Sequence, residues 1–240
     1  MTLRTARRLT AALGCLGVLL VAAPAQAVTD PFETANRRIH GFNQQLRTHL
    51  LGPLAESYVA VTPPPWREGI ARVASNLAEP ITAVNGLIAG DPALARNAMA
   101  RFGINSTLGR GGVRDVAAER GLPHRALSLA DAACGRGLPS GPYLVLPVLG
   151  PSTLRDAGAM AVTSAALAQL VGGEWLAGVG VGDGFVTYAA RHETLRQVDA
   201  TALDSYAVLR SAYLQRRAAT CAIDRAQLLA LEAAEDSGDR

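Results

Sequence analysis

The segment that most constrains this fold runs from Leu138 to Asp156 and reads LPSGPYLVLPVLGPSTLRD. It carries no charge before Arg155 and Asp156, and four prolines interrupt it. Proline lacks an amide donor and clashes with the preceding helical turn, so the segment cannot form a regular helix. Both it and the uncharged block that follows, 157–173, are shorter than the roughly 20 residues that a membrane span needs. A buried hairpin in a soluble core and a segment lying in the plane of a bilayer are both compatible with this pattern.

The sequence around Asp30 predicts the first helix. Asp30 is expected as the N-cap, Pro31 as the first helical residue and Glu33 as the residue that closes a capping box. Apolar residues then recur at steps of three and four, which indicates one apolar helix face. They are Phe32, Ala35, Ile39, Phe42, Leu46 and Leu50. This face can pack on an ordinary core or lie in lipid.

Most of the remaining chain also reads as helical. Prolines 53 and 63–65 are expected to break it, and a short helix over 69–77 is expected to end before Pro80, with a separate apolar segment at 81–88. Asp91-Pro92 predicts another helix start, and 109–112 a glycine-rich turn. Alternating glycines at 178–184 fit close helix packing or a loop, and we favour a loop. A long helix is expected from Ala202 towards Glu235, with Tyr206, Leu209 and Tyr213 on one side.

The chain begins with the features of an export signal. Residues 1–27 combine three early arginines, an apolar run and the small-x-small sequence Ala25-Gln26-Ala27. Cleavage after Ala27 is favoured over lipid attachment at Cys15, because the apolar run continues well past that cysteine. We therefore expect one domain over 28–231 and a polar, frayed tail over 232–240. In an exported compartment Cys134 and Cys221 can pair, or either can be a small core residue.

Charge and motif content exclude several functions. The net charge is +3, which the three arginines of the signal account for, and the other basic residues are scattered. Nucleic-acid binding is therefore not expected, since it needs basic residues clustered on one face. The four histidines lack metal-ligand spacing, and no serine lies in a nucleophile elbow. We expect no metal, no cofactor and no enzymatic activity.

Several motifs occur in an order that resembles the MlaA/VacJ family, outer-membrane lipoproteins that take part in phospholipid trafficking. The first is Asp30-Pro31-Phe32-Glu33, followed by Asn36-Arg37 and Phe42-Asn43. The second is Arg101-Phe102-x-x-Asn105, running on to Asp115, and the third runs from Gly141-Pro142-Tyr143 through Pro147 to Arg155-Asp156. Near Asp131 the chain departs from the family pattern, reading Asp-Ala-Ala-Cys where the family usually has Gln-Thr-Leu-Gly.

The resemblance implies an all-α fold, a ring of amphipathic helices with proline-broken apolar segments, embedded in one leaflet. It implies the outer-membrane part of a phospholipid transport system, on the periplasmic face, that removes mislocalised phospholipid from the outer leaflet. A trimeric porin and a soluble periplasmic lipid carrier are the implied protein partners. The alternatives are an exported hydrolase acting on lipid or cell wall, and a structural adaptor that binds porin.

Candidate residues for the lipid path are those of the quoted motifs. Arg155 can meet a lipid phosphate, because a guanidinium offers a planar set of donors. The alternative is that Arg155 pairs with an acid such as Asp156 at the start of a helix. The full candidate set is Asp30, Pro31, Glu33, Asn36, Arg37, Phe42, Asn43, Arg101, Asn105, Asp115, Gly141, Pro142, Tyr143, Pro147, Arg155 and Asp156.

Overall fold

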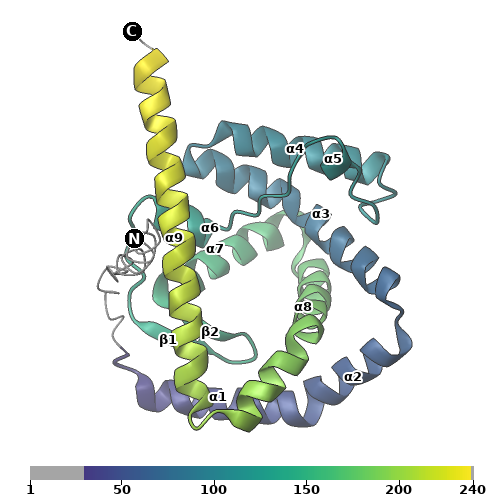
Figure 1. Cartoon of the computed structure of the whole chain (residues 1–240), viewed down its shortest axis with the longest axis vertical. Coiled ribbons are helices and arrows are strands. Elements are labelled where there is room, and N and C mark those ends of the chain that lie inside the picture. The colour runs from purple at the N-terminus through teal and green to yellow at the C-terminus, as the bar shows by residue number, and fades with distance from the viewer. Residues whose placement is uncertain (1–29, 239–240) are drawn as a thin grey trace, which may run out of the picture.

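The computed structural model describes residues 30–238, without the side chains at 170–171, 175–177, 179, 224, 227–228 and 230–238. Its helices form a ring, which Figure 1 shows face on. One side of the ring consists of α1 (Glu33–Leu46), the π-helical turn η1 (Arg47–Leu51) and α2 (Gly52–Val61). The ring continues through α3 (Pro64–Ala89), which packs along α4 (Pro92–Thr107), and then α5 (Val116–Glu119) and α6 (Leu129–Gly135).

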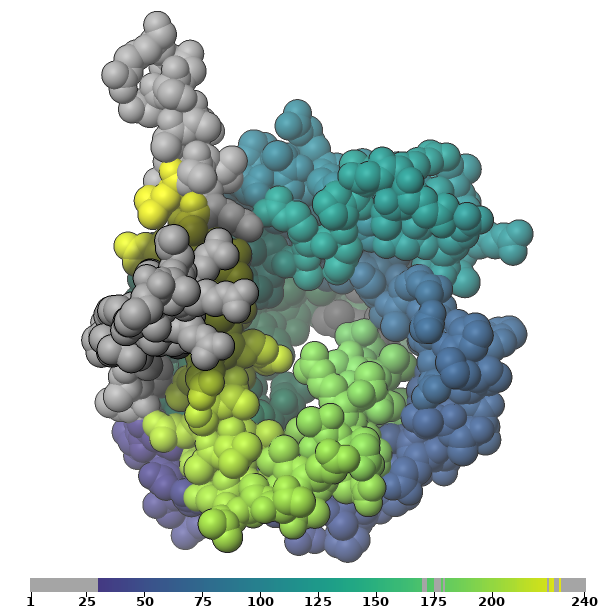
Figure 2. Space-filling model, viewed as in Figure 1, coloured from purple at the N-terminus to yellow at the C-terminus, as the bar shows by residue number. Residues whose placement is uncertain are grey.

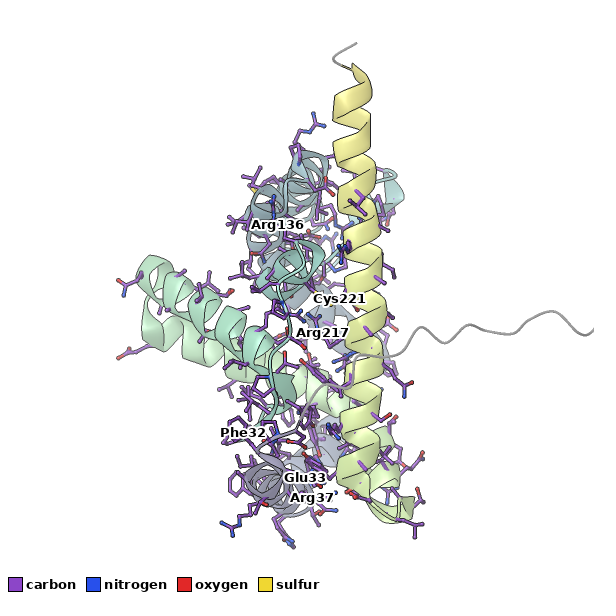
Figure 3. All side chains as sticks on the ribbon, turned by 90° about the vertical axis from the view of Figure 1, so that its left-hand side faces the viewer. Phe32, Glu33, Arg37, Arg136, Arg217 and Cys221 are labelled. Atoms are coloured by element: carbon purple, nitrogen blue, oxygen red, sulfur yellow. A yellow bond between two sulfur atoms is a disulfide. The ribbon has the colours of Figure 1, made fainter. Side chains whose placement is uncertain are left out.

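A small hairpin, a helical arm and a long strap complete the chain. Strands β1 (Tyr143–Leu146) and β2 (Gly150–Thr153) are antiparallel, with Tyr143 opposite Thr153. Helices α7 (Leu154–Val171) and α8 (Gly173–Thr201) contact each other and project from one face of the ring, as the edge-on view in Figure 3 shows. Helix α9 (Ser205–Gly238) then crosses from α1 to α6 and continues beyond the ring. It extends through most of the expected tail.

The predicted helical ring is confirmed, with the β1–β2 hairpin as its non-helical part. The proline-rich segment forms this hairpin, as one of the two alternatives anticipated. Pro151 lies in β2, and Pro147 lies in the turn, where the next residue, Val148, has φ +69°. A β-branched residue rarely adopts this conformation. Its amide donates a hydrogen bond to Asn43 Oδ1 at 2.7 Å, which holds the turn in place.

Three expected breaks do not occur. Helical backbone continues past Pro53, because η1 widens the turn before it and Pro53 lies at the start of α2, where no amide donor is needed. Helix α3 continues through Pro80, so 69–77 and 81–88 belong to one helix. Tertiary packing against α4, including a buried ion pair from the adjacent Glu79, offsets the cost of that proline. The glycines at 178–184 lie within α8 and not in a loop.

The start of α1 differs from the expected capping box. The helix begins at Glu33, and its N-cap residue Phe32 makes no side-chain capping bond. Asp30 instead accepts a hydrogen bond from Asn36 Nδ2 at 2.8 Å, and Glu33 pairs with Arg37 one turn along. The carboxylate of Asp30 is therefore used for tertiary contact, which outweighs its local role as a cap. By contrast, α4 starts as predicted, with Asp91 accepting from the Leu94 amide.

Burial in the described residues is inverted relative to a soluble protein. Twelve apolar residues are buried, but seven of them are alanines, and twelve polar or charged residues are equally buried. Large apolar side chains are exposed along the helices of the ring, including Phe42, Leu54, Trp66, Val84 and Leu87. In soluble proteins such exposed patches mark contact with a membrane or a partner. No helix within residues 30–238 has both the length and the apolar character needed to cross a membrane.

Two adjacent residues of α1 illustrate the inversion and allow a direct test. Asn43 is 2% exposed, whereas Phe42 is 54% exposed. We expect Asn43→Ala to lower the free energy of unfolding by about 2–3 kcal/mol, because it leaves buried backbone groups of the hairpin unpaired. Phe42→Asp should leave unfolding in detergent almost unchanged but reduce retention in membranes. Chemical denaturation in detergent and membrane fractionation measure the two effects, and equal destabilisation by both variants would contradict the inversion.

Candidate functional site

Two asparagines of α1 hold the β-hairpin. Asn36 accepts from the Val145 amide at 2.9 Å and donates to the Tyr143 carbonyl at 3.1 Å. Seven residues later, Asn43 accepts from the Val148 amide and donates to the Leu146 carbonyl at 2.9 Å. Each side-chain amide thus pairs with β1 as a neighbouring strand would. Residues seven apart lie on one helix face. Helix α1 therefore fixes the position of the hairpin along its own length.

Helix α9 closes the ring, and its contact with the rest of the chain is called the seam here. The seam comprises one face of α9, with Tyr206, Arg210, Tyr213, Arg217 and Cys221 at steps of three and four. At its lower end the Tyr206 hydroxyl donates to Asp30, and the guanidinium of Arg210 lies 3.7 Å from the same carboxylate. Beside them Arg37 binds Asp204 through two nitrogens and stacks on the Tyr206 ring. The first and last helices of the ring are therefore joined through ionised groups, which form stronger hydrogen bonds than neutral ones.

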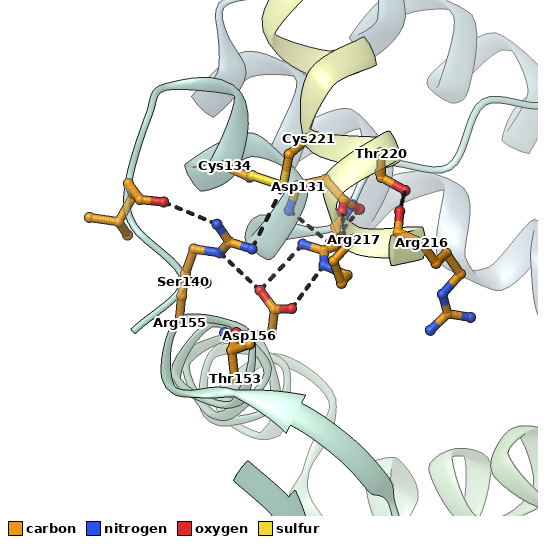
Figure 4. The surroundings of a disulfide bond; sticks show 12 residues. Asp131, Cys134, Ser140, Thr153, Arg155, Asp156, Arg216, Arg217, Thr220 and Cys221 are labelled. Atoms are coloured by element: carbon orange, nitrogen blue, oxygen red, sulfur yellow. Dashed lines mark hydrogen bonds and ion pairs between the residues drawn. A yellow bond between two sulfur atoms is a disulfide. The ribbon is translucent and has the colours of Figure 1, made fainter. Parts of the chain in front are cut away.

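The upper end of the seam is centred on Asp156 (Figure 4). This carboxylate accepts from the Tyr213 hydroxyl and pairs with Arg217 at 2.9 Å. Arg217 also donates to Asp131 of α6. Cys134 of α6 and Cys221 of α9 form a disulfide with their Cα atoms 5.4 Å apart. The pairing that the sequence left open is thus present, and it links α6 to α9 covalently.

Arg155 lies beside these groups. Its side chain is 5% exposed, and its guanidinium donates to Asp156 Oδ1 at 2.9 Å and to the Leu138 carbonyl at 3.0 Å. Arg155 lies in the first turn of α7, which is capped by Thr153, whose hydroxyl accepts from the Asp156 amide. This geometry favours the alternative in which Arg155 pairs with Asp156, because its donors already bind Asp156 and the Leu138 carbonyl.

A second buried polar cluster joins α3, α4 and α5. Arg101, 3% exposed, donates to Glu79 at 2.5 Å and to Asp115 at 2.9 Å. Asn105 donates to Asp115 at 3.0 Å and accepts from the Ala117 amide at 2.9 Å. This cluster fixes the glycine-rich turn at 109–112, where a Cβ on Gly112 would come within 2.7 Å of Asn76.

The surrounding charges shift several pKa values. Burial, the hydrogen bond to Asp30 and the charge of Asp30 raise the pKa of Tyr206. Burial likewise raises the pKa of Tyr143, to about 12, with the charge of Asp30 acting in the same direction. Tyr213 shows the same direction through burial and its bond to Asp156. For Asp131, burial opposes ionisation, but bonds from Ser128 and Arg217 outweigh it and lower its pKa.

The predicted site residues therefore fall into separate groups rather than one pocket. Asp30, Asn36, Asn43, Tyr143 and Asp156 meet at the hairpin and the seam, while Arg101, Asn105 and Asp115 form the second cluster. Gly141 has φ +68°, and Pro142 accepts from the Leu154 amide beside it. Pro31, Glu33 and Phe42 are exposed. The sequence reasoning did not single out the acidic partners of the arginines, Glu79, Asp131, Asp199 and Asp204. The sequence signal for the seam was the regular spacing of tyrosine, arginine and cysteine on one face of α9.

The space within the ring bears on what the site can do. Figure 2 shows openings in the middle of the ring, bordered by α8 and α9. A separate cavity of about 390 Å³ lies between η1, α2 and α8, next to the ion pair of Arg47 with Asp199 and to His192. Within the part of the chain that the structure describes, no three or more histidines, cysteines or acids are placed to hold a metal ion. The geometry thus provides a bordered opening with apolar surface outside and ionised groups inside the protein.

Comparison with known proteins places this architecture. The family model described as MlaA lipoprotein matches residues 28–220. The chain belongs to the MlaA lipoprotein family. The chain is also similar to a solved structure described as the structural basis for maintenance of bacterial outer membrane lipid asymmetry. That structure has a TM-score of 0.69 and 32% identity, over 80% of this chain and 99% of its own.

Two relatives show the extent of the sequence similarity. An intermembrane phospholipid transport system lipoprotein MlaA of Haemophilus influenzae is 32% identical over 196 residues, or 78% of this chain and 76% of its own. An uncharacterized protein of Rickettsia felis is 36% identical over 144 residues, or 60% of this chain. The match spans 57% of that relative's length, little more than half.

The two tyrosines of the seam and Tyr143, which packs against Tyr206, allow a test of the electrostatics. Because their folded pKa values are raised above the usual 10, the neutral form stabilises the fold below pH 10, and this contribution is lost as pH rises further. We expect Tyr143, Tyr206 and Tyr213 to ionise only well above pH 10 in absorbance titration near 295 nm, and normally in denaturant. Tyr206→Phe should remove one late-titrating group and lower unfolding stability by about 1.5–3 kcal/mol, the range for a hydrogen bond to a charged group. Ionisation of every tyrosine near pH 10 would contradict the seam.

Proposed function

We propose that this protein is the outer-membrane component of a system that moves phospholipid between membranes. It would remove mislocalised phospholipid from the outer leaflet and so maintain lipid asymmetry. The observation that carries the proposal is the inverted ring: polar groups pair inside the protein while large apolar side chains cover its helices. The family and the phospholipid-transport name of the Haemophilus relative support the same function.

The ring suits a position within one leaflet. Amphipathic helices that present an apolar face bind in the boundary between headgroups and acyl chains. Exposed residues on the perimeter helices α1 to α3, such as Leu50, Trp66 and Leu77, provide that face. Non-helical backbone such as the β-hairpin is tolerated at membrane depth where protein covers it, and Asn36 and Asn43 cover its backbone groups.

A phospholipid needs a polar route for its headgroup and apolar surface for its tails. The openings in the ring supply a route, and the surrounding helices supply the surface. Transport by this means requires no catalytic group, and we propose no enzymatic step. A soluble periplasmic carrier would receive the lipid, and a trimeric porin would position the ring on the periplasmic side of the outer membrane.

A gene-deletion strain tests this function. We expect more phospholipid on the cell surface, measured by labelling with an amine reagent that does not enter cells, and greater sensitivity to detergent. The runner-up, an exported hydrolase, would instead change the lipid or cell-wall products without changing surface phospholipid. A structural adaptor would alter only the porin association. Unchanged surface phospholipid in the deletion strain would contradict transport.

Arg155 separates a role in the lipid path from a role in the seam. Because its guanidinium is buried against Asp156 and the Leu138 carbonyl, we expect Arg155→Ala to lower the abundance of the protein in membranes. Arg155→Lys should be milder, since it keeps the charge. Arg114→Ala is the control, because that side chain is exposed and pairs only at the surface with Glu119. Normal abundance combined with lost transport in both Arg155 variants would instead place Arg155 on the lipid path.

A further inference from the structure

The arm formed by α7 and α8 projects from one face of the ring (Figure 3). Its base is fixed on both sides. Helix α7 starts in the seam with Arg155 and Asp156, and the end of α8 is tied to the ring by the ion pair of Asp199 with Arg47. At a rise of 1.5 Å per residue, the 18 residues of α7 are about 27 Å long.

The composition of the arm is unlike that of a helix pair in water. Between Asp156 and Arg191, only Glu174 and Asp183 are charged at neutral pH. Several apolar side chains that the structure describes on the arm are exposed, including Val162 at 59% and Val181 at 73%. The charges of α8 resume at Arg191, where the helix runs along α2. Apart from Asp183, charge is thus confined to the base and the tip of the arm.

We propose that this arm is inserted in the bilayer and extends from the leaflet that holds the ring into the hydrocarbon of the opposite leaflet. One leaflet contributes about 15 Å to a hydrocarbon core about 30 Å thick. A helix about 27 Å long exceeds that depth even after its first turns pack on α6. The inference rests on the proposed function, because it takes the ring to lie in one leaflet.

The sequence at the tip fits a second polar boundary. The tip reads Gly172-Gly173-Glu174-Trp175, with Gly172 between the two helices and the other three residues in the first turn of α8. Tryptophan is enriched where hydrocarbon meets headgroups, because its ring is apolar and its N–H needs a polar partner. A tip that had not reached this boundary would place the carboxylate of Glu174 in hydrocarbon.

Asp183 is the one charge in the middle of the arm. A carboxylate at membrane depth is tolerated where it faces a water-filled space. Asp183 lies on α8 with its side chain exposed, so insertion of the arm requires water or headgroups beside this carboxylate. Insertion of the arm in the opposite leaflet also sets the orientation of the ring. The face that carries the arm is directed towards the outer leaflet, so a lipid from that leaflet meets the arm before the opening.

The chain has two tryptophans, and this makes the test direct. Trp66→Phe leaves only Trp175 at the tip of the arm, and Trp175→Phe leaves only Trp66 on the rim. The full mature chain of each variant is reconstituted in vesicles of brominated phosphatidylcholine, and its fluorescence is compared with that in unbrominated vesicles. We expect brominated lipid to remove most of the emission of both tryptophans, and dissolved acrylamide to quench Trp175 far less than it does in the denatured chain.

Each of the other quenching results would contradict insertion of the arm. Quenching of Trp66 by brominated lipid, with Trp175 quenched only by acrylamide, would place the arm in water and overturn the inference while leaving the proposed function intact. If brominated lipid quenches neither, the ring is not embedded and both proposals fall. Protection of Trp175 from acrylamide only at high protein-to-lipid ratio would show that a second copy covers the arm, which also overturns the inference.

A pair of substitutions at one exposed position gives an independent readout. Val181→Arg should reduce the quenching of Trp175 by brominated lipid, because the charge is costly in hydrocarbon. Val181→Leu should leave the quenching unchanged. Both variants keep the seam and the α1–hairpin contacts, so the quenching of Trp66 in the matching background reports whether the ring is still embedded. Equal quenching of Trp175 in both variants would contradict insertion.

Discussion

The ring depends on α9, because this helix joins the start of the described chain at Asp30 to α6 and to the start of α7. Its seam face binds Asp30 before α1, Asp156 at the start of α7 and Asp131 in α6. Each of these acids is paired with arginine, tyrosine or both, and Cys221 adds a covalent bond to α6. Breaking one buried ion pair leaves the other charge uncompensated, which costs several kcal/mol. A ring held in this way is therefore strongly coupled along α9 from Tyr206 to Cys221.

The proposed position of the ring in one leaflet accounts for its reliance on polar contacts between helices. Between helices in lipid, hydrophobic association gives little driving force, because acyl chains are as apolar as leucine. Hydrogen bonds and ion pairs must then decide which helices meet. The buried clusters around Arg101 and around Asp156 have this role, and small residues such as Ala83, Ala95 and Ala98 let α3 and α4 approach closely. The same arrangement would be a poor design for a soluble core, in which apolar side chains supply most of the stability.

Part of this structure could be predicted from residues alone. The long final helix, the start of α4 at Asp91 and the glycine turn at 109–112 follow from local propensities, and the structure confirms them. Local rules failed at Pro80 and at Asp30, where a buried ion pair beside the proline and a bond across to α9 outweigh the local preference. The apolar periodicity of α1 was read correctly, but periodicity cannot tell which face is inside. Burial of Asn36 and Asn43 reverses the usual assumption.

The site was harder to predict, because its contacts join residues far apart in sequence. Asp156 and Arg217 are 61 residues apart, and Cys134 and Cys221 are 87 apart. No spacing rule connects such residues. The regular repeat on α9 does indicate which face of that helix contacts the rest of the protein. The disulfide has a further consequence for a protein in a leaflet. A ring that could part between α6 and α9 would admit lipid from its own leaflet there, and the disulfide prevents parting at this junction. Under the proposed function, covalent closure between α6 and α9 thus favours movement of lipid through the ring over entry at that junction.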